Sequence, residues 1–531
     1  MPGLDKRIVA RLDFARALRR ILVDTETDLI VAPHYEHLYN AAGHELAKHA
    51  ASLLRDGKYE TDLPFSISVP KARGFTRAGS SLHPIDRIVY QLIADELAVP
   101  IESEIDRQRV FSNQLIEPDP GGQMFRAASD AYEDMQGMLK FQARSHDFIV
   151  KLDIANYYER LPQHAMINLL ASIGCEPELV SFTEKMLLAF QQRQSIGLPQ
   201  GLFPSDLLGN FFLISFDAQC ELRGVKSLRY SDDIYIPCKS YNDARKLLSW
   251  ASDMLRRDSL YLNEAKSMIT RADTLVAEER EVEELFLQTV NDLRDVGLDV
   301  GYYGYGFVTD MAAPIYDVRA ADAEKAVEAL QDLLREDNDS RPDYIAKIDK
   351  FALPILGRLS SDLGIDRALL GIHSRPYLTQ IYATYLARFV GSNADLVDCL
   401  AGLAVSADIG HYEQMLLLRT LMNSESLSQQ YVLDLARILT DQASPEPVRA
   451  LAAMLTTKFG SAAQQRVVKL RYEDEGSPYM RAALLYCATW MTRADRNTCK
   501  RVWGPHSVVN GILASVLEST ANRTKSTNPG T

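Results

Sequence analysis

Apolar residues in the first 60 positions recur mostly at intervals of three and four. This spacing places them along one face of an α-helix, so it predicts a helical N-terminal region over residues 1–60. The apolar series is Leu12, Ala15, Leu18, Leu22, Leu38, Ala42, Leu46 and Leu53. The first helix is strongly basic, with Lys6, Arg7, Arg11, Arg16, Arg19 and Arg20. Such a basic face is either solvated or in contact with nucleic acid, and the sequence leaves both interpretations open.

The apolar period changes to two at Phe65, which predicts a strand. Gly74 permits a turn, an extended segment resumes at Thr76, and Pro84 starts a long helix. The predicted hairpin carries Lys71, Arg73 and Arg77. Arg can bind phosphate through two donors and Lys adds a point charge, so this hairpin suits a triphosphate. Basic hairpins are also common on protein surfaces, and alone the feature decides nothing.

Residues 146–154 show a sharp strand pattern with Asp153 at its end, followed by a turn and a helix over residues 163–171. Acids are rarely left unpaired at the end of a buried strand. Asp153 is therefore placed to reach a metal ion. The alternative is that Asp153 caps the helix that follows.

Two later stretches carry further candidate chemistry. Leu198-Pro199-Gln200-Gly201 precedes a buried helix over residues 207–222, and a Gly without a Cβ lets the backbone approach a bound base pair. Residues 227–237 predict a strand, a tight turn and a strand, with Asp232 and Asp233 at the tip. Adjacent side chains of a strand point to opposite faces. Both acids therefore serve one site only if the turn redirects them, and taken alone such a pair is usually an exposed turn.

Beyond the hairpin, an amphipathic helix over residues 241–257 leads to an extended segment over residues 260–267 that contains Lys266. An acidic helix over 276–292 and a Gly/Tyr-rich stretch at 301–306 form a linker region, residues 276–319. Residues 320–521 are predicted to be helical throughout, in pieces with short breaks. Residues 444–451 and 477–484 are alike, each with Ser-Pro before a helix. The tail, residues 522–531, is expected to be disordered.

Bulk composition narrows the class of protein. At 531 residues the chain is long enough for two or three domains, and 47% hydrophobic and 24% charged residues are ordinary for a soluble protein. We find no signal peptide pattern and no run of roughly 18 apolar residues. The six cysteines form no C-x-x-C pair, which disfavours zinc and disulfides and favours the cytoplasm. A net charge of −13 argues against a general nucleic-acid coat protein but not against a polymerase with a basic channel.

Taken in order, these stretches resemble the palm of a reverse transcriptase. The palm resemblance rests on Asp153 with Tyr157 and Tyr158, on L-P-Q-G-x-x-x-S at 198–205, on Y-x-D-D at 230–233 and on L-x-x-x-K-S at 262–267. P-K-x-x-G-x-x-R at 70–77, followed by Asp86-Arg87, is similar to the fingers hairpin of bacterial reverse transcriptases and group II intron enzymes. The resemblance implies an α/β right-hand polymerase with fingers and palm over residues 61–275. The repeated helices resemble a HEAT-like α-solenoid, and an irregular helical bundle is the alternative.

The resemblance also implies roles for individual residues. Two divalent ions, Mg²⁺ or alternatively Mn²⁺, would be held by Asp153, Asp232, Asp233 and the backbone carbonyl of Ile154. Lys71 and Arg77 would contact the incoming dNTP, Gln200 and Gly201 would line the nascent pair, Tyr158 would exclude a ribose 2′-hydroxyl, and Lys266 would neutralise or protonate pyrophosphate. Two departures are Ala78, where many relatives have Pro, and Ser231 in a variable position. Neither removes a metal ligand, so we expect an active enzyme.

A reverse transcriptase palm followed by helical repeats resembles the abortive-infection type of bacterial antiphage reverse transcriptases. The implied activity is DNA synthesis without a copied template, primed by a protein tyrosine in a homo-oligomer, so that the DNA product is covalently attached. Tyr35 and Tyr39 are the candidate priming residues. One alternative is a retron-like enzyme templated by a dedicated non-coding RNA, although Val308-Thr309 is followed by Asp310 rather than Gly. The other is a catalytically silent interaction scaffold.

Overall fold

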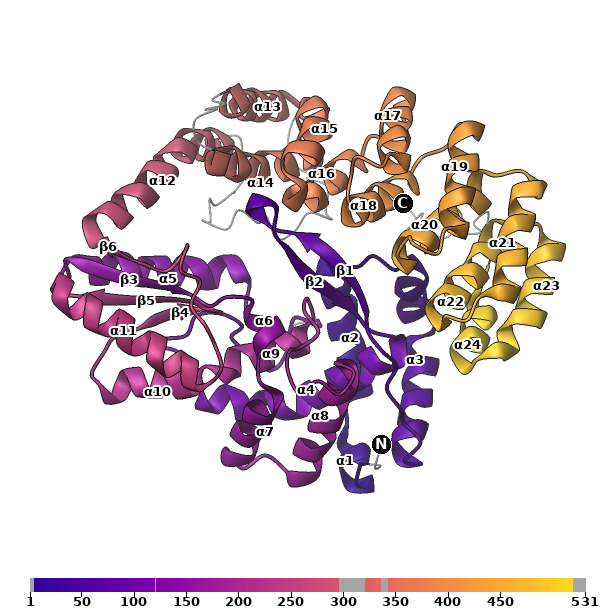
Figure 1. Cartoon of the computed structure of the whole chain (residues 1–531). Coiled ribbons are helices and arrows are strands. Elements are labelled where there is room, and N and C mark those ends of the chain that lie inside the picture. Colours follow the sequence, from indigo (N-terminus) through magenta and orange to yellow (C-terminus); the bar gives the residue numbers. More distant parts are fainter. Residues whose placement is uncertain (1–3, 120, 296–319, 336–341, 519–531) are drawn as a thin grey trace. The chain divides into compact units, whose positions relative to one another are not determined.

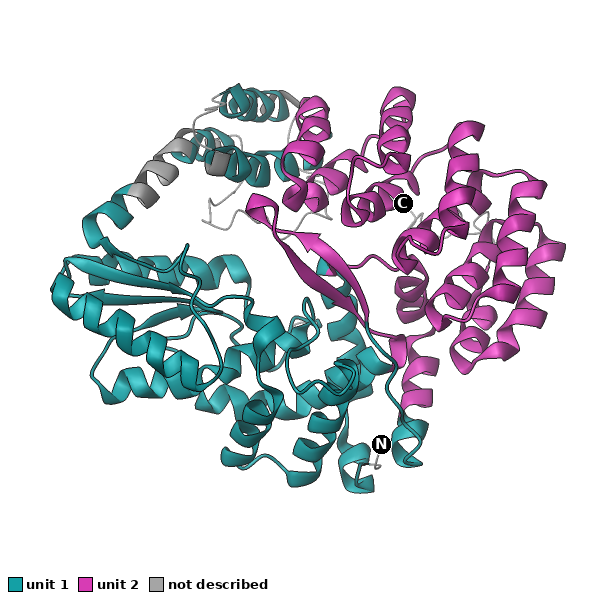
Figure 2. Cartoon of the chain, in the orientation of Figure 1, with its two compact units in different colours: residues 1–27, 51–64, 86–361 teal, residues 28–50, 65–85, 362–531 magenta. Residues whose placement is uncertain are grey.

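The computed structural model describes residues 4–119, 121–295, 320–335 and 342–518. The chain divides into two compact units (Figure 2), of which unit 1 contains residues 1–27, 51–64 and 86–361 and unit 2 contains the remainder. Neither unit is continuous in sequence. The stretch 301–306, the tripeptide at 308–310 and the tail 522–531 lie outside the described residues.

Unit 1 is built around a four-stranded antiparallel sheet with strand order β4-β5-β3-β6 (Figure 1). The strands are β3 (Phe148–Asp153), β4 (Leu228–Tyr230), β5 (Asp233–Cys238) and β6 (Met268–Arg271). Ile149, Leu228 and Tyr235 pack with Met135 and Leu139 of α5 (Ala128–Ala143). α11 (Tyr241–Arg257) also packs on the sheet. This arrangement explains the nearly continuous apolar pattern of β3, whose Ile149, Val150 and Leu152 are all buried.

Helices make up most of the rest of unit 1. They include α1 (Lys6–Arg11), α2 (Phe14–Asp24), α4 (Pro84–Glu104), α6 (Tyr157–Arg160), α7 (Gln163–Ser172), α8 (Pro177–Phe190), α9 (Phe203–Phe212), α10 (Ile214–Leu222), α12 (Ala272–Asp295), α13 (Ala320–Arg335) and α14 (Pro342–Arg358). The predicted helix over 207–222 is two helices, because the chain bends at Leu213. The segment 260–267 is not simply extended, since residues 264–266 form a turn and strand β6 begins only at Met268.

The basic N-terminal helices of unit 1 are held by acidic partners within the unit. Arg20 is fully buried, and its guanidinium donates to Asp95 at 2.7 Å and to Glu117 at 2.9 Å. Arg11 donates to Glu96 at 2.6 Å and also to Glu176. These guanidinium groups fasten the N-terminal helices to the unit, which neither of the two sequence interpretations anticipated.

Unit 2 joins α3 (Pro33–Arg55, as far as residue 50), an antiparallel hairpin and a series of helices. The hairpin is β1 (Phe65–Pro70) and β2 (Thr76–Ser81). An aromatic cluster explains this grouping: the ring of Tyr479 lies 4.6 Å from that of His34, 5.4 Å from that of Tyr35 and 4.4 Å from that of Phe65. Tyr35 Oη is also 3.0 Å from His83 Nδ1. Segments far apart in sequence therefore share one core.

The helices of unit 2 pack in two rows. The helices are α15 (Ile365–Ser374), α16 (Thr379–Leu386), α17 (Ala394–Val405), α18 (His411–Leu421), α19 (Gln429–Thr440), α20 (Glu446–Phe459), α21 (Ala462–Asp474), α22 (Pro478–Cys487), α23 (Arg493–Trp503) and α24 (Val508–Val516). α18, α20, α22 and α24 stack in that order, and α17, α19 and α21 form the second row. The two similar Ser-Pro stretches start α20 and α22. Residues 447–457 of α20 are all buried, as expected for a helix covered on every side.

Candidate active site

The end of β3 and the β4–β5 turn bring three acids together in unit 1. Asp153 and Asp233 are directly opposite each other in the β3–β5 pairing, so their side chains share one face. Between β4 and β5, Ser231 adopts a φ of 54°, in the left-handed region. This turn redirects Asp232, whose carboxyl interacts electrostatically with both Asp233 and Asp153. The predicted convergence of the acids is thus present in the fold.

Burial, together with the carboxylates of Asp233 and Asp153, raises the pKa of Asp232 to about 6. A divalent cation would relieve this repulsion, and carboxylate oxygens are the hard ligands that Mg²⁺ prefers. Among the described residues, no group of three or more His, Cys, Asp or Glu side chains has the geometry of a metal site. The donor set fits Mg²⁺ by its chemistry, and Asp153, Asp232 and Asp233 are the residues that would hold it.

Lys266 binds the carboxylate at the end of β3 directly. Its Nζ lies 3.0 Å from Asp153 Oδ2, so the ammonium partly neutralises the acidic cluster. The turn at 264–266 places it there, because the Asn263 and Ser267 groups flanking the turn bind the backbone of Asp153. Asn263 N–H donates to Asp153 O at 2.8 Å, and Asp153 N–H donates to Ser267 Oγ at 3.1 Å. Ile154 forms an isolated bridge with Leu262, and its carbonyl remains a predicted ligand.

A buried polar network holds the turn that carries Asp232. Arg229, fully buried on β4, donates to the carbonyl of Ser231 at 3.0 Å, while Ser231 N–H donates to Ser112 Oγ at 2.7 Å. The Arg229 guanidinium also contacts both carboxylate oxygens of Asp217 and the side-chain oxygen of Asn210. None of these four supporting residues was predicted from the sequence. The one available signal was an Arg within a buried strand, which requires an acidic partner.

Tyr158 lies beside the acids on α6 and is fixed from α9. Its hydroxyl donates to Asp206 Oδ1 at 3.0 Å. A Cβ at Gly209 would lie only 2.7 Å from Tyr158 Cε1, so the absence of a side chain there makes room for the ring. Burial raises the pKa of Tyr158, which keeps the phenol a neutral donor. The ring is therefore held in one position close to the cluster.

Gln200 and Gly201 lie in the loop that connects to α9, close to Tyr158. Leu198 N–H donates to Tyr158 O at 2.9 Å, and Gly201 has a φ of 95°, a conformation that favours glycine. Buried Asp24 of α2 caps α9, because both its carboxylate oxygens lie 3.3 Å from Phe203 N. Arg87 binds the same carboxylate at 2.9 Å. This pair fixes the loop from a distant part of the sequence and was not anticipated.

Lys71 and Arg77 belong to unit 2, on the β1–β2 hairpin, and so do the candidate priming residues Tyr35 and Tyr39 on α3. The other predicted site residues belong to unit 1. The contact of Lys71 and Arg77 with a triphosphate remains a prediction.

None of the described helices is long and apolar enough to cross a membrane.

Comparison with known proteins identifies the polymerase part. Residues 69–291 match the family described as reverse transcriptase (RNA-dependent DNA polymerase). A search of curated sequences found no match. Similar solved structures include telomerase from Candida albicans with a fragment of telomeric RNA, at 10% identity and a TM-score of 0.32, covering 65% of this chain and 66% of that one. Two telomerase structures from Candida tropicalis also match. The one with a fragment of telomeric RNA has 11% identity and a TM-score of 0.33, and the apo structure has 12% identity and a TM-score of 0.31.

These two alignments cover 78% and 84% of this chain and 68% and 72% of those chains. The structural matches are too distant to carry an argument, and the family match agrees with the position of the three acids. The chain therefore contains a reverse transcriptase domain over residues 69–291 and is an enzyme of the DNA polymerase class.

Proposed function

We propose that this enzyme adds dNTPs to DNA by two-metal nucleotidyl transfer and acts in antiphage defence of the abortive-infection type. The convergence of Asp153, Asp232 and Asp233 carries the proposal, since two ions about 3.5–4 Å apart would clamp the attacking hydroxyl and the leaving pyrophosphate. When bound, Mg²⁺ or Mn²⁺ supplies this charge stabilisation. Lys266 shields the negative charge of Asp153, and Tyr158 sets the width of the sugar pocket.

Synthesis without a template, primed by a tyrosine of the chain within a homo-oligomer, is the mode that we favour. The support is the second unit, whose stacked helix pairs fit a HEAT-like repeat. The proposed partners are dNTPs and a covalently attached DNA product, with a bound RNA as the templated alternative.

The candidate priming tyrosines need revision. Tyr35 is 3% exposed and Tyr39 is 4% exposed, so neither hydroxyl lies at the surface of unit 2. Tyr261 is 60% exposed, and its carbonyl accepts from Ala155 N–H at 2.8 Å, just beyond the catalytic strand. We therefore place Tyr261 ahead of Tyr35 and Tyr39 as the site of DNA attachment.

The decisive experiment is incubation of the full chain with one dNTP and Mg²⁺, without template, followed by intact-mass analysis. We expect a ladder of protein species that each differ by one nucleotide, and peptide mapping should find the DNA on a tyrosine. Defined products that require a co-purified RNA would instead indicate templated synthesis. If the Asp232→Ala/Asp233→Ala variant protected cells from phage as well as the wild-type protein does, the result would favour a catalytically silent scaffold.

Gly209→Ala tests the position of Tyr158. The new methyl group would lie 2.7 Å from Tyr158 Cε1 and force the ring away from Asp206. Displacements of about 1 Å near reacting groups are costly, so we expect discrimination between dNTPs and rNTPs to fall by about tenfold. Gly137→Ala on α5 is the matched control, since a Cβ there meets nothing within 4 Å. Steady-state incorporation of dNTP and rNTP measures the ratio, and equal ratios in both variants would contradict the role of Tyr158.

A further inference from the structure

The outer edge of β1, in the β1–β2 hairpin of unit 2, has no partner strand among the described residues. Its sheet has only two strands, and Lys71 N–H donates to the carbonyl of Phe75 at 2.6 Å. Opposite residues of an antiparallel pair alternate between bonded and non-bonded pairs. Continuing the register from Lys71, the odd-numbered residues of β1 bond to β2. Ser66 and Ser68 therefore direct their N–H and C=O groups to the free edge.

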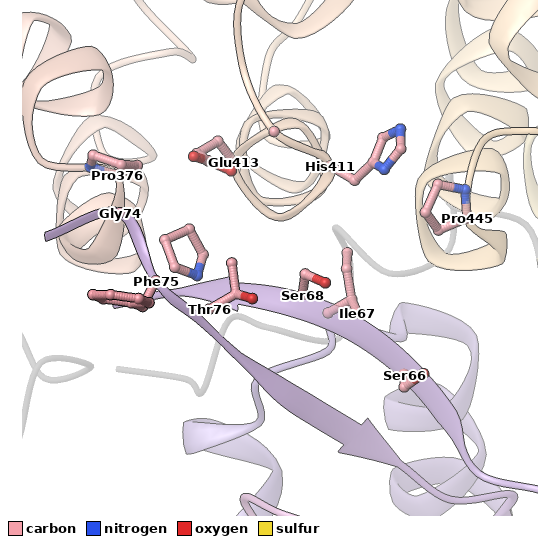
Figure 3. Close-up of a pocket in the computed structure, with 12 residues that line it drawn as sticks. Ser66, Ile67, Ser68, Gly74, Phe75, Thr76, Pro376, His411, Glu413 and Pro445 are labelled. Atoms are coloured by element: carbon pink, nitrogen blue, oxygen red, sulfur yellow. The ribbon is translucent and has the colours of Figure 1, made fainter. Parts of the chain in front are cut away.

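A hollow of about 520 Å³ in unit 2 lies along this edge (Figure 3). On the hairpin side it is lined by Ser66, Ser68, Thr76 and the ring of Phe75, which is 71% exposed. The opposite side is formed where helices begin, at Pro376, Gly410, His411, Glu413 and Pro445. The basic hairpin residues Lys71, Arg73 and Arg77 are not among the residues that line it.

Glu413 lines this hollow, and one oxygen of its carboxylate lacks a hydrogen-bond donor among the described residues. The residue is only 6% exposed, and its Oε2 has no hydrogen-bond donor within the described parts of the chain. The carboxylate lies over the start of α18, where a Cβ at Gly410 would be 2.6 Å from Oε2. Burial raises the pKa of Glu413. A buried carboxylate oxygen without a donor is costly, and a cationic ligand would remove that cost.

We propose that this hollow binds an extended peptide, which adds to β1 as a third strand and directs a Lys or Arg side chain to Glu413. Addition of a strand to a free edge is a recurring mode of peptide recognition, in which main-chain hydrogen bonds give affinity and side-chain pockets give specificity. Phe75 offers an aromatic face to the same cation. The volume lies within the range of about 300–1,000 Å³ usual for ligand pockets.

Charge decides between a peptide and a nucleic acid. A phosphodiester chain along β1 would place negative charge next to Glu413, whereas a basic peptide meets an opposite charge there. The alternating donors and acceptors of Ser66 and Ser68 match those of another strand. The proposed peptide is thus a partner of the helical unit.

Selection from a random heptapeptide library on the immobilised full-length chain tests the proposal, with affinities then measured by fluorescence polarisation. We expect enriched peptides to carry Lys or Arg among alternating β-branched or aromatic residues. Glu413→Gln should weaken binding by about tenfold, the value of one charge-assisted hydrogen bond, and should remove the preference for Lys or Arg. Failure to enrich any peptide, or enrichment without a basic residue, would overturn the proposal.

Two proline variants separate the free edge of β1 from general damage to the hairpin. Ser68→Pro removes an N–H that points to the hollow, and Ser80→Pro removes one on the outer edge of β2, without touching the bonded pairs. Ser68→Pro should abolish peptide binding, and Ser80→Pro should leave it unchanged. Equal loss in both variants, at equal thermal stability, would contradict strand addition. If Ser68→Pro and Glu413→Gln instead weakened the binding of a labelled single-stranded oligonucleotide, the hollow would be a nucleic-acid site and the proposal would fail.

Discussion

Asp232→Asn is expected to reduce nucleotide addition by about a thousandfold or more while leaving the fold intact. Charge stabilisation by metal ions contributes several kcal/mol to the transition state, and each 1.4 kcal/mol is about a factor of ten. The turn itself should survive, because Arg229 and Ser112 bind the backbone of Ser231 and not the Asp232 carboxylate. Incorporation of radiolabelled dNTP measures the loss. Asp253→Asn on α11 is the matched control. Asp253 forms an exposed ion pair with Arg256, so this variant should keep full activity.

The same variant should not lose stability in metal-free buffer. The pKa of Asp232 is raised to about 6 from 3.8, so the folded state binds a proton more readily than the unfolded chain. The contribution of this group to stability is therefore present below pH 3.8 and is lost as pH rises through about 6. Asn cannot ionise, so the melting temperature of the variant should equal or exceed that of wild type above pH 6. Lower stability of Asp232→Asn at pH 8 would contradict the convergence of the three carboxylates.

Strands and acids near the site were predictable because their patterns are local. Alternation over residues 146–154 and 227–237 predicts β3, β4 and β5, and helix α11 has the predicted bounds. The order of the acidic motifs was sufficient to place Asp153 and Asp232 in one site. The backbone of Ser231 could not be predicted in the same way, since its left-handed φ depends on bonds to residues up to 119 positions away.

Tertiary packing accounts for most of what the sequence did not show. Tyr35 and Tyr39 lie among His, Glu and Asn and therefore suggest a surface, yet α3 buries both side chains, and the ring of Tyr35 packs against that of Tyr479. The hairpin looked like part of one polymerase domain, but its aromatic contacts place it with the helical unit. Asp24 and Arg87 are 63 positions apart, so no pattern of neighbouring residues could reveal that they bind each other or that Asp24 caps α9.

Arg229→Leu is expected to destabilise the chain by about 3–5 kcal/mol, the cost of breaking a buried ion pair by removing one partner. Arg229 is fully buried, and its Nη2 lies 2.7 Å from Asp217 Oδ2. Removal of the guanidinium leaves that carboxylate buried without its counter-charge. It also removes the donors to Asn210 and to the carbonyl of Ser231. Denaturant unfolding should show the loss, and nucleotide addition should fall with it.

The double variant Arg229→Leu/Asp217→Leu distinguishes a role in stability from a role in positioning the turn. Removing both charges leaves no unpaired ion, and hydrophobic replacement of a buried pair is often neutral. We expect most of the stability to return. Activity should remain low, because the carbonyl of Ser231 still lacks its donor and the turn no longer holds Asp232 against Asp153. Recovery of both stability and activity would show that Arg229 only balances the charge of Asp217, and that Ser112 alone fixes the catalytic turn.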